Sequence, residues 1–150
     1  MATDHLVILA HGSSREAWRA PIEALSARIA ERSAGPVHLA WLEAAPPDLE
    51  AVLAGAVAQG ATAVRVLPLF WSSGGHVARD VPPLVAAARA RWPHLAVTVL
   101  PAVGEHPRVL AALVDIAAEV SGAPPAGRAS APDPSGRSSP AAPAQGETSP

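Results

Sequence analysis

Apolar runs and segments of helical apolar spacing alternate along the first part of the chain. Four short apolar runs predict buried strands. The run at 63–70 is apolar at nearly every position, which is typical of a central strand in a parallel sheet. The four strands are expected at 5–10, 37–42, 63–70 and 95–100.

Segments with apolar residues at helical spacing follow each of these strands. Asp48 and Asp80 are good N-cap residues, because their carboxylates can accept the free N–H groups of a first helical turn. The four helices are expected at 18–32, from Asp48 to near Gly60, from Asp80 to near Trp92, and from Pro107 onward.

Regular alternation of strand and helix predicts an α/β fold with a parallel sheet, helices on both faces and right-handed crossovers. We expect a three-layer, flavodoxin-like architecture with the strand order 2-1-3-4. This order places the topological switch point between the first and third strands. Ligands of such folds bind beyond the carboxyl ends of the strands, near that point.

The composition divides the chain near residue 121. Residues 121–150 are mostly Ala, Pro, Ser and Gly, and they contain no Val, Ile, Leu, Phe or Trp. Such a segment cannot bury enough apolar surface to offset its ordering entropy. We therefore expect one folded domain over 1–120 and a disordered tail over 121–150.

Several classes of site and partner are disfavoured by composition. The chain has no Cys, which excludes disulfides and thiolate metal sites. A formal net charge of −2 gives no sign of the basic face that nucleic acids require. No apolar run reaches the roughly 18 residues of a membrane span, and the start of the chain does not resemble a signal peptide. We expect a cytoplasmic protein that binds neither nucleic acid nor a membrane.

Two histidines are the most informative candidates for chemistry. His11 follows the first strand and His76 follows the third, each in a turn rich in Gly and Ser. In the expected strand order both lie at the switch point. Two imidazoles at one edge can share a divalent metal, since neutral imidazole binds cobalt, nickel, iron and zinc. His11 and His76 are therefore the predicted metal-binding and catalytic pair.

Other polar residues are expected at the same edge of the sheet. Glu43 follows the second strand and could ligate a metal or accept a proton. Glu105 and His106 follow the fourth strand, on the correct side but farther from the switch point. Trp41 and Trp71 flank the edge, where they either stack on a flat ligand or pack in the ordinary way. The remaining histidines, expected at the opposite end as structural or solvated residues, are His5, His38 and His94.

The two histidine turns also carry candidate substrate-binding residues. Ser13 or Ser14 could cap the following helix and leave backbone N–H groups for an anion. Arg79 could reach a substrate carboxylate. The candidates for substrate contact are Ser13, Ser14, Arg15, Ser73, Gly74, Gly75 and Arg79. The phosphate-binding motifs GxGxxG and GxxxxGK[ST] and the hydrolase elbow GxSxG are absent, and Ala10 stands where a histidine phosphatase would have Arg.

The motifs LAHGSSRE, AWLEAAPPDLEAVL and VRVLPLFWSSGGHVARDVPPL, in this order, resemble the small class II chelatases of the CbiX type. These are sirohydrochlorin cobaltochelatases, with nickel chelatases and ferrochelatases as relatives. The resemblance covers residues 5–118, and the segment LFxxGGHVxRDxP is its most specific element. One departure is Ser14, where many relatives have Arg, and Arg15 follows one position later.

The resemblance implies a chelatase-like fold that inserts a divalent metal into sirohydrochlorin during cobalamin or siroheme synthesis. Cobalt is the expected metal, with nickel or iron as alternatives, and the metal is a substrate rather than a permanent cofactor. It further implies that His11 and His76 bind the metal, that Glu43 assists, and that a homodimer forms. Arg15, Arg79 and Arg108 are expected to pair with carboxylates of the tetrapyrrole. The alternative hypothesis is a non-catalytic metal-binding or metal-delivery module.

Overall fold

The computed structural model describes residues 3–122, apart from the side chains of Thr3 and His76. The expected tail therefore lies outside the described residues except at its start. The chain divides by its internal contacts into two units, Met1–Val114 and Asp115–Pro150. The first unit holds the sheet, three helices and the beginning of a fourth helix. The described part of the second unit holds the rest of that helix.

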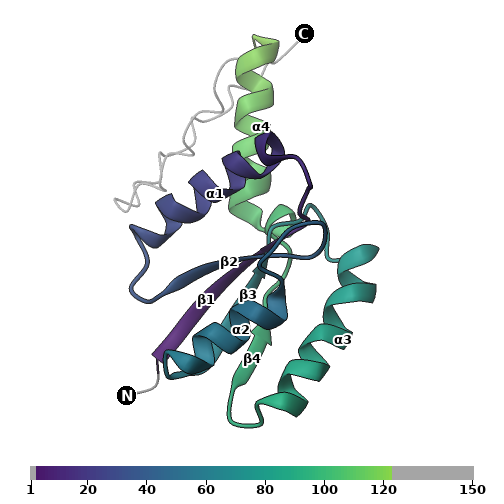
Figure 1. Cartoon of the computed structure of the whole chain (residues 1–150). Coiled ribbons are helices and arrows are strands. Elements are labelled where there is room, and N and C mark those ends of the chain that lie inside the picture. Colours follow the sequence, from purple (N-terminus) through teal and green to yellow (C-terminus); the bar gives the residue numbers. More distant parts are fainter. Residues whose placement is uncertain (1–2, 123–150) are drawn as a thin grey trace, which may run out of the picture. The chain divides into compact units, whose positions relative to one another are not determined.

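Strands and helices alternate throughout the described chain (Figure 1). The strands are β1 (Thr3–Ala10), β2 (Val37–Trp41), β3 (Ala61–Pro68) and β4 (Ala96–Val99). The helices are α1 (Glu16–Ala30), α2 (Leu49–Ala58), α3 (His76–Arg91) and α4 (Pro107–Ser121), and a short 3-10 helix, η1, covers Val103–Glu105. Within residues 3–122 no helix is both long and apolar enough to cross a membrane.

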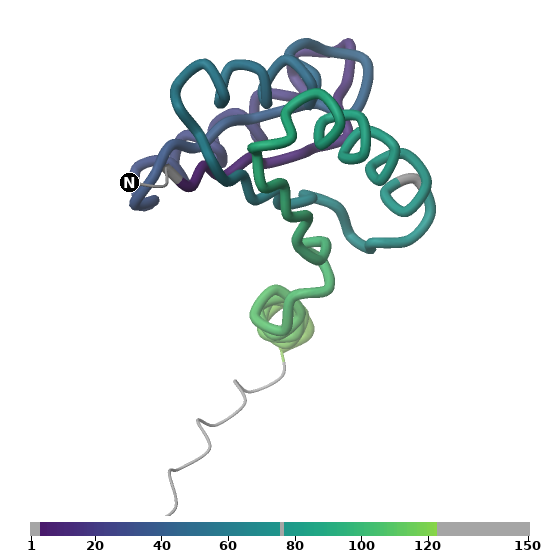
Figure 2. Tube along the Cα trace, turned by 90° about the horizontal axis from the view of Figure 1, so that it is seen from below, coloured from purple at the N-terminus to yellow at the C-terminus, as the bar shows by residue number. Residues whose placement is uncertain are grey.

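The four strands form one parallel sheet in the order β2-β1-β3-β4, as predicted. β1 is paired on both sides, with Ala10 opposite Trp41 of β2 and Leu9 opposite Pro68 of β3. The first and third strands are therefore neighbours. The loops that follow them leave the sheet at the same edge, which we call the carboxyl edge (Figures 1 and 2).

The core lies between the sheet and the two helices α2 and α3. Val7 and Leu9 of β1 are fully buried, and so are Val64 and Val66 of β3. These strand residues alternate along the chain and therefore share one face of the sheet. The helix residues packed into the same core are Leu49, Val52, Leu53 and Ala56 of α2 and Val77, Val81, Val85 and Ala88 of α3.

The helix α2 begins as the sequence predicts, whereas α3 does not. The Asp48 carboxylate accepts a hydrogen bond from the Ala51 backbone N–H at 2.8 Å and so caps α2. The predicted cap at Asp80 is wrong, because α3 already begins at His76, with Gly75 as the N-cap residue. Gly75 has φ +58°, a conformation that a residue without a Cβ adopts at little cost. This turn starts the helix about one turn earlier than the Asp signal indicated.

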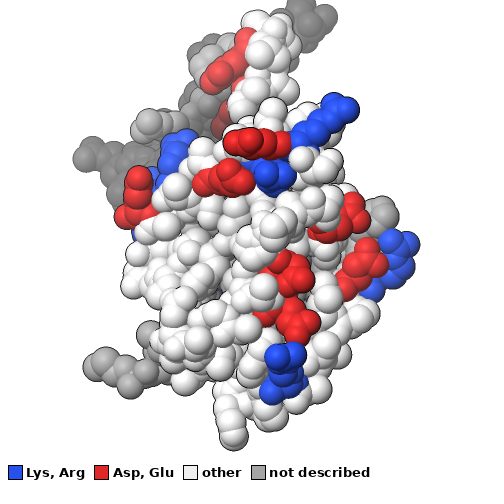
Figure 3. Space-filling model, in the orientation of Figure 1, with Lys and Arg blue, Asp and Glu red and all other residues white. Residues whose placement is uncertain are grey.

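Charged side chains are scattered over the face of the molecule that Figure 3 shows. On the face seen in Figure 3, acidic and basic side chains lie interspersed, and no broad basic area is in view. This distribution agrees with the net charge of −2.

Candidate metal site at the carboxyl edge

His11 and Glu43 are brought together by the backbone of two neighbouring strands. His11 directly follows β1, and Glu43 lies two residues after β2. The Leu42 N–H donates to the Ala10 carbonyl at 2.8 Å, and the Glu43 N–H donates to the His11 carbonyl at 3.0 Å. The hydrogen bonding between β1 and β2 thus continues past both strands. It fixes the two residues side by side at the carboxyl edge.

Gly12 allows this close approach. A Cβ at Gly12 would lie 1.9 Å from the carbonyl oxygen of Glu43, far closer than any real contact. Gly12 also has φ +97°, a backbone angle that residues with a Cβ rarely adopt. A glycine is therefore required here for two independent reasons.

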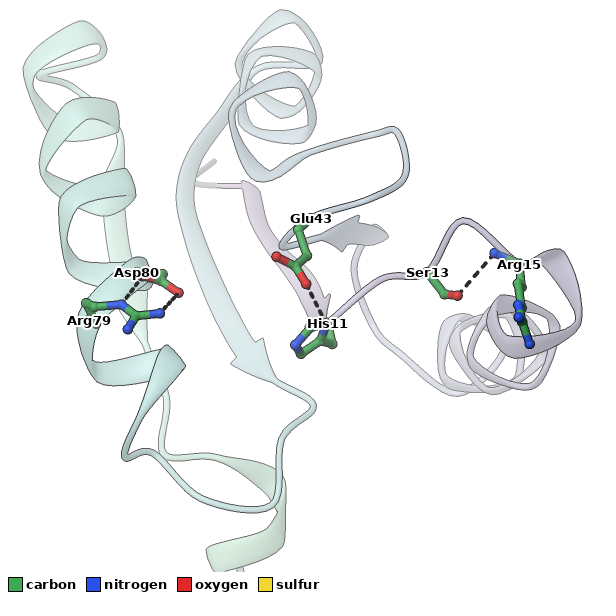
Figure 4. A network of polar contacts seen from close by, with 6 residues as sticks. All are labelled: His11, Ser13, Arg15, Glu43, Arg79 and Asp80. Atoms are coloured by element: carbon green, nitrogen blue, oxygen red, sulfur yellow. Dashed lines mark hydrogen bonds and ion pairs between the residues drawn. The ribbon is translucent and has the colours of Figure 1, made fainter.

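The two side chains point toward one another (Figure 4). Nδ1 of His11 lies 3.3 Å from Oε1 of Glu43. The side chains are 53% and 63% exposed, so the pair is open to a solute. The ring of Phe70, which follows β3, lies 6.2 Å from the His11 ring between centroids. His11 and Glu43 thus lie at one edge, as predicted, and they are also in contact with one another.

His76 is the first residue of α3, and its side chain lies outside the described residues. The loop that leads to it, residues 71–75, follows β3 at the same edge as His11. Its backbone position agrees with the prediction, and the side-chain contact with a metal remains a prediction. Within the described residues, no three His, Cys, Asp or Glu side chains converge in a way that could hold a metal ion.

The turn after His11 differs in detail from its predicted role. Arg15, not Ser13 or Ser14, is the N-cap residue of α1, and no side chain caps this helix. The Ser13 hydroxyl instead accepts a hydrogen bond from the Arg15 N–H at 3.1 Å, and the Ser13 carbonyl accepts one from Arg19 at 2.7 Å. Ser13 therefore shapes the turn locally. Figure 4 shows Ser13 and Arg15 set to one side of the His11–Glu43 pair.

The guanidinium of Arg79 is held by its neighbour. Nε of Arg79 lies 2.8 Å from Oδ1 of Asp80, and Nη2 lies 3.3 Å from Oδ2 (Figure 4). The hydrogen bonds to Asp80 raise the pKa of Arg79 above its ordinary value, and the negative charge of Asp80 raises it to a smaller extent. Arg79 is 69% exposed, which leaves it accessible to an anionic solute.

Two backbone N–H groups of the loop before His76 are engaged within the protein. The Ser73 N–H donates to Glu105 at 2.6 Å, and the Gly74 N–H donates to the Ser72 hydroxyl at 3.1 Å. These two groups have partners within the protein, and a contact of Ser73 and Gly74 with a substrate stays a prediction. The structure gives no contact that tests the role of Gly75 toward a substrate.

Glu105 forms hydrogen bonds with Ser73 that the sequence did not indicate. Its second oxygen accepts a hydrogen bond from the Ser73 hydroxyl at 2.8 Å. The Ser73 N–H, followed by the Ser73 hydroxyl, holds the pKa of Glu105 below its ordinary value. The sequence places Glu105 at the correct edge but carries no signal for a partner 32 residues away.

The two tryptophans at this edge differ in exposure. Trp41 is only 3% exposed and packs in the core, whereas Trp71 is 65% exposed. Of the two open interpretations, ordinary packing therefore holds for Trp41. Trp71 is therefore accessible to a flat ligand at this edge.

Comparison with known proteins gives the family. The chain is 31% identical over 81 residues to a sirohydrochlorin cobaltochelatase from Methanocaldococcus jannaschii, a match covering 53% of this chain and 57% of the relative. It is 31% identical over 87 residues to the sirohydrochlorin cobaltochelatase of Methanosarcina acetivorans, covering 56% and 67%. The matches thus span only about three fifths of these relatives' lengths.

Solved structures share the fold. A CbiX protein from Marinobacter aquaeolei superposes with a TM-score of 0.71 at 28% identity, over 79% of this chain and 98% of that one. The chelatase SirB from Bacillus subtilis subspecies spizizenii, solved in complex with cobalt, has a TM-score of 0.71 at 24% identity, over 79% and 51%. The CbiX family model matches residues 5–120, nearly all of the described chain. The chain therefore belongs to the CbiX family.

Proposed function

We propose that this chain is a chelatase that inserts a divalent metal into sirohydrochlorin, with cobalt as the expected metal and nickel or iron as alternatives. The observation that carries the proposal is the exposed His11–Glu43 pair, at the same edge of the sheet as the start of α3 at His76, in a chain of the CbiX family. The names of the two relatives, both sirohydrochlorin cobaltochelatases, and the cobalt complex of SirB support the choice of substrate and metal.

The spacing of His11 and Glu43 suits two donors to one ion. Ligands bound at about 2.0–2.2 Å to a tetrahedral ion lie about 3.3–3.6 Å apart. The 3.3 Å between Nδ1 of His11 and Oε1 of Glu43 falls in this range. In the proposed site His11 and His76 hold the metal, and Glu43 either joins them or accepts a proton. Such a site keeps coordination positions open, which the transfer of the metal requires.

Insertion exchanges one ion for two protons. The divalent metal enters the macrocycle as the two pyrrole N–H groups lose their protons, so the charge of the macrocycle is unchanged. A base at the site must accept these protons, and positioned proton transfer contributes about 10²–10⁴ in rate. The imidazole of His11 and the carboxylate of Glu43 are the bases that we propose for this step.

Carboxylates of the tetrapyrrole are expected to meet exposed arginines. Arg15, Arg79 and Arg108 are exposed in the described structure. Guanidinium groups bind carboxylates with paired hydrogen bonds, which orient a ligand as well as hold it. We further expect a second copy of the chain to complete the site as a homodimer. The match with SirB supports this expectation, because it covers only 51% of that longer chain.

The decisive experiment follows the absorbance of anaerobic sirohydrochlorin with cobalt, nickel or ferrous ion, with the wild-type protein beside His11→Ala. A metal-dependent spectral change, faster than the spontaneous reaction and lost in the variant, is expected. The three metals are ranked by rate in the same assay. Metal binding without acceleration by any metal would instead support the delivery module.

A further inference from the structure

The loop before His76 has a sequence that does not fix its own shape. Residues 71–75, here called the His76 loop, read Trp-Ser-Ser-Gly-Gly. Glycine loses more conformational freedom on folding than any other residue, so two in succession need support from outside the loop. The loop ends at Gly75, whose φ of +58° sets where α3 begins. Its conformation therefore decides where the backbone of His76 lies.

Glu105 supplies support at the middle of the loop. Its Oε1 accepts the Ser73 N–H at 2.6 Å, and its Oε2 accepts the Ser73 hydroxyl at 2.8 Å. The same Ser73 hydroxyl oxygen accepts the Ala102 N–H at 3.0 Å. Hydrogen bonds to an ionised acceptor are roughly twice as strong as neutral ones. One carboxylate thus binds the backbone and the side chain of a single loop residue.

The start of the His76 loop is held by the same neighbouring segment. The Gly104 N–H donates to the Phe70 carbonyl at 2.9 Å. A Cβ at Gly104 would lie 2.2 Å from the carbonyl oxygen of Trp71, so the two backbones are in direct contact. Gly104 is itself buried. The segment from Ala102 to Glu105 therefore contacts the loop at its beginning and at Ser73.

We propose that Glu105 is a positioning residue of the metal site, whose carboxylate fixes the His76 loop and thereby the position of His76. The inference rests on the proposed function of this site. Both oxygens of Glu105 are engaged by Ser73, which distinguishes this carboxylate from the open Glu43. Glu105 acts on the metal through His76.

The test compares Glu105→Gln with the wild-type protein in two measurements that need no tetrapyrrole. The amide of glutamine replaces one acceptor oxygen with a donor, so Ser73 loses one of its two bonds to this side chain. Hydrogen exchange over residues 71–76 is expected to become faster in the metal-free protein. Cobalt affinity is expected to fall about 10- to 100-fold, the range found when groups that orient metal ligands are removed. Ser73→Ala provides a second, smaller change with the same expected direction.

Two controls separate positioning from a general loss of structure. Glu31→Gln changes an exposed carboxylate just after α1 and is expected to alter neither measurement. In a His76→Ala background, Glu105→Gln should cause no further loss of cobalt affinity, because the residue acts through His76. A purely structural role would instead lower the affinity in both backgrounds.

Each outcome decides the proposal. Unchanged exchange in Glu105→Gln and Ser73→Ala, or faster exchange with unchanged cobalt affinity, would overturn it. A wild-type protein that binds no cobalt would overturn both this inference and the proposed function. Failure of the proposed function alone is distinguishable, since cobalt binding would then still depend on Glu105 while sirohydrochlorin gains no metal.

Discussion

His5 and His38 share a hydrogen bond between two neighbouring strands, with Nδ1 of His5 lying 2.9 Å from Nε2 of His38. Their rings are stacked, with centroids 5.1 Å apart and planes inclined by 18°. His5 is only 1% exposed. One nitrogen must donate and the other accept, so the bond requires that at least one imidazole be neutral. The pair is a structural element of the sheet, away from the carboxyl edge.

This pair predicts that the protein loses stability in mild acid. Burial, followed by the charge of His5, lowers the pKa of His38 from 6.5. The unfolded chain then binds more protons than the folded one as the pH falls below about 6.5. The free energy of unfolding should therefore be highest above pH 6.5 and decline as the pH falls through the lowered folded-state pKa. Urea unfolding between pH 5 and 8 measures this dependence.

His38→Asn should flatten that pH dependence, and His94→Asn is the matched control. His94 is exposed, and its replacement should leave the slope unchanged. An equal slope in wild type and His38→Asn would show that other groups cause the acid sensitivity.

Gly12→Ala should be strongly destabilising and should displace the metal site. The added Cβ would overlap the Glu43 carbonyl, and alanine is strained at φ +97°. Gly60→Ala is a matched control, because Gly60 has φ +84° but open space around a Cβ. The control should cost about 1–2 kcal/mol in the free energy of unfolding, from backbone strain alone. Gly12→Ala should cost clearly more in urea unfolding and also weaken cobalt binding. Equal costs would mean that the loop shifts without penalty.

Asp48→Ala should lower the free energy of unfolding by about 1 kcal/mol, because it removes the N-cap of α2. Asp48→Asn keeps an acceptor oxygen and should retain most of the stability. Thermal or urea unfolding of the two variants distinguishes capping from a charge effect. A similar loss in both variants would indicate that the negative charge, rather than the hydrogen bond, matters at this position.

The parts of this structure that local sequence determines could be predicted. The nearly continuous apolar run of β3 indicated a central strand, and Asp48 indicated the start of α2. Each of these patterns lies within, or directly next to, the element that it predicts. The start of α3 could not be predicted, because Gly75 turns the chain before the stronger Asp80 signal is reached. The bonds of Ser73 with Glu105 join loops 32 residues apart. Such a contact depends on how the strands are ordered and has no local pattern.

The same distinction holds within the candidate metal site. The sequence predicted that His11 and Glu43 lie at one edge of the parallel sheet. His11 directly follows β1, and Glu43 lies two residues after β2. The sequence did not indicate that Gly12 permits their contact by approaching the Glu43 backbone. Trp41 and Trp71 were indistinguishable in sequence, and only their burial separates them.

Glu43→Gln should slow the insertion of metal into sirohydrochlorin without abolishing it. His76→Ala should have the more severe effect, because it should abolish insertion while the protein still folds. Glutamine keeps the size of the side chain and one carbonyl oxygen, but it can neither accept a pyrrole proton at pH 7 nor provide a negative charge. The measurements are the insertion rate with cobalt and the cobalt affinity without tetrapyrrole, for both variants and for the control Glu31→Gln.

The pattern of losses assigns the role of Glu43. A slower rate at unchanged cobalt affinity identifies a proton acceptor, since the metal is then bound without it. A parallel fall in affinity identifies a ligand, as the 3.3 Å separation from Nδ1 of His11 allows. Full activity at unchanged affinity would remove Glu43 from the mechanism. It would leave His11 and His76 as the residues that the insertion requires.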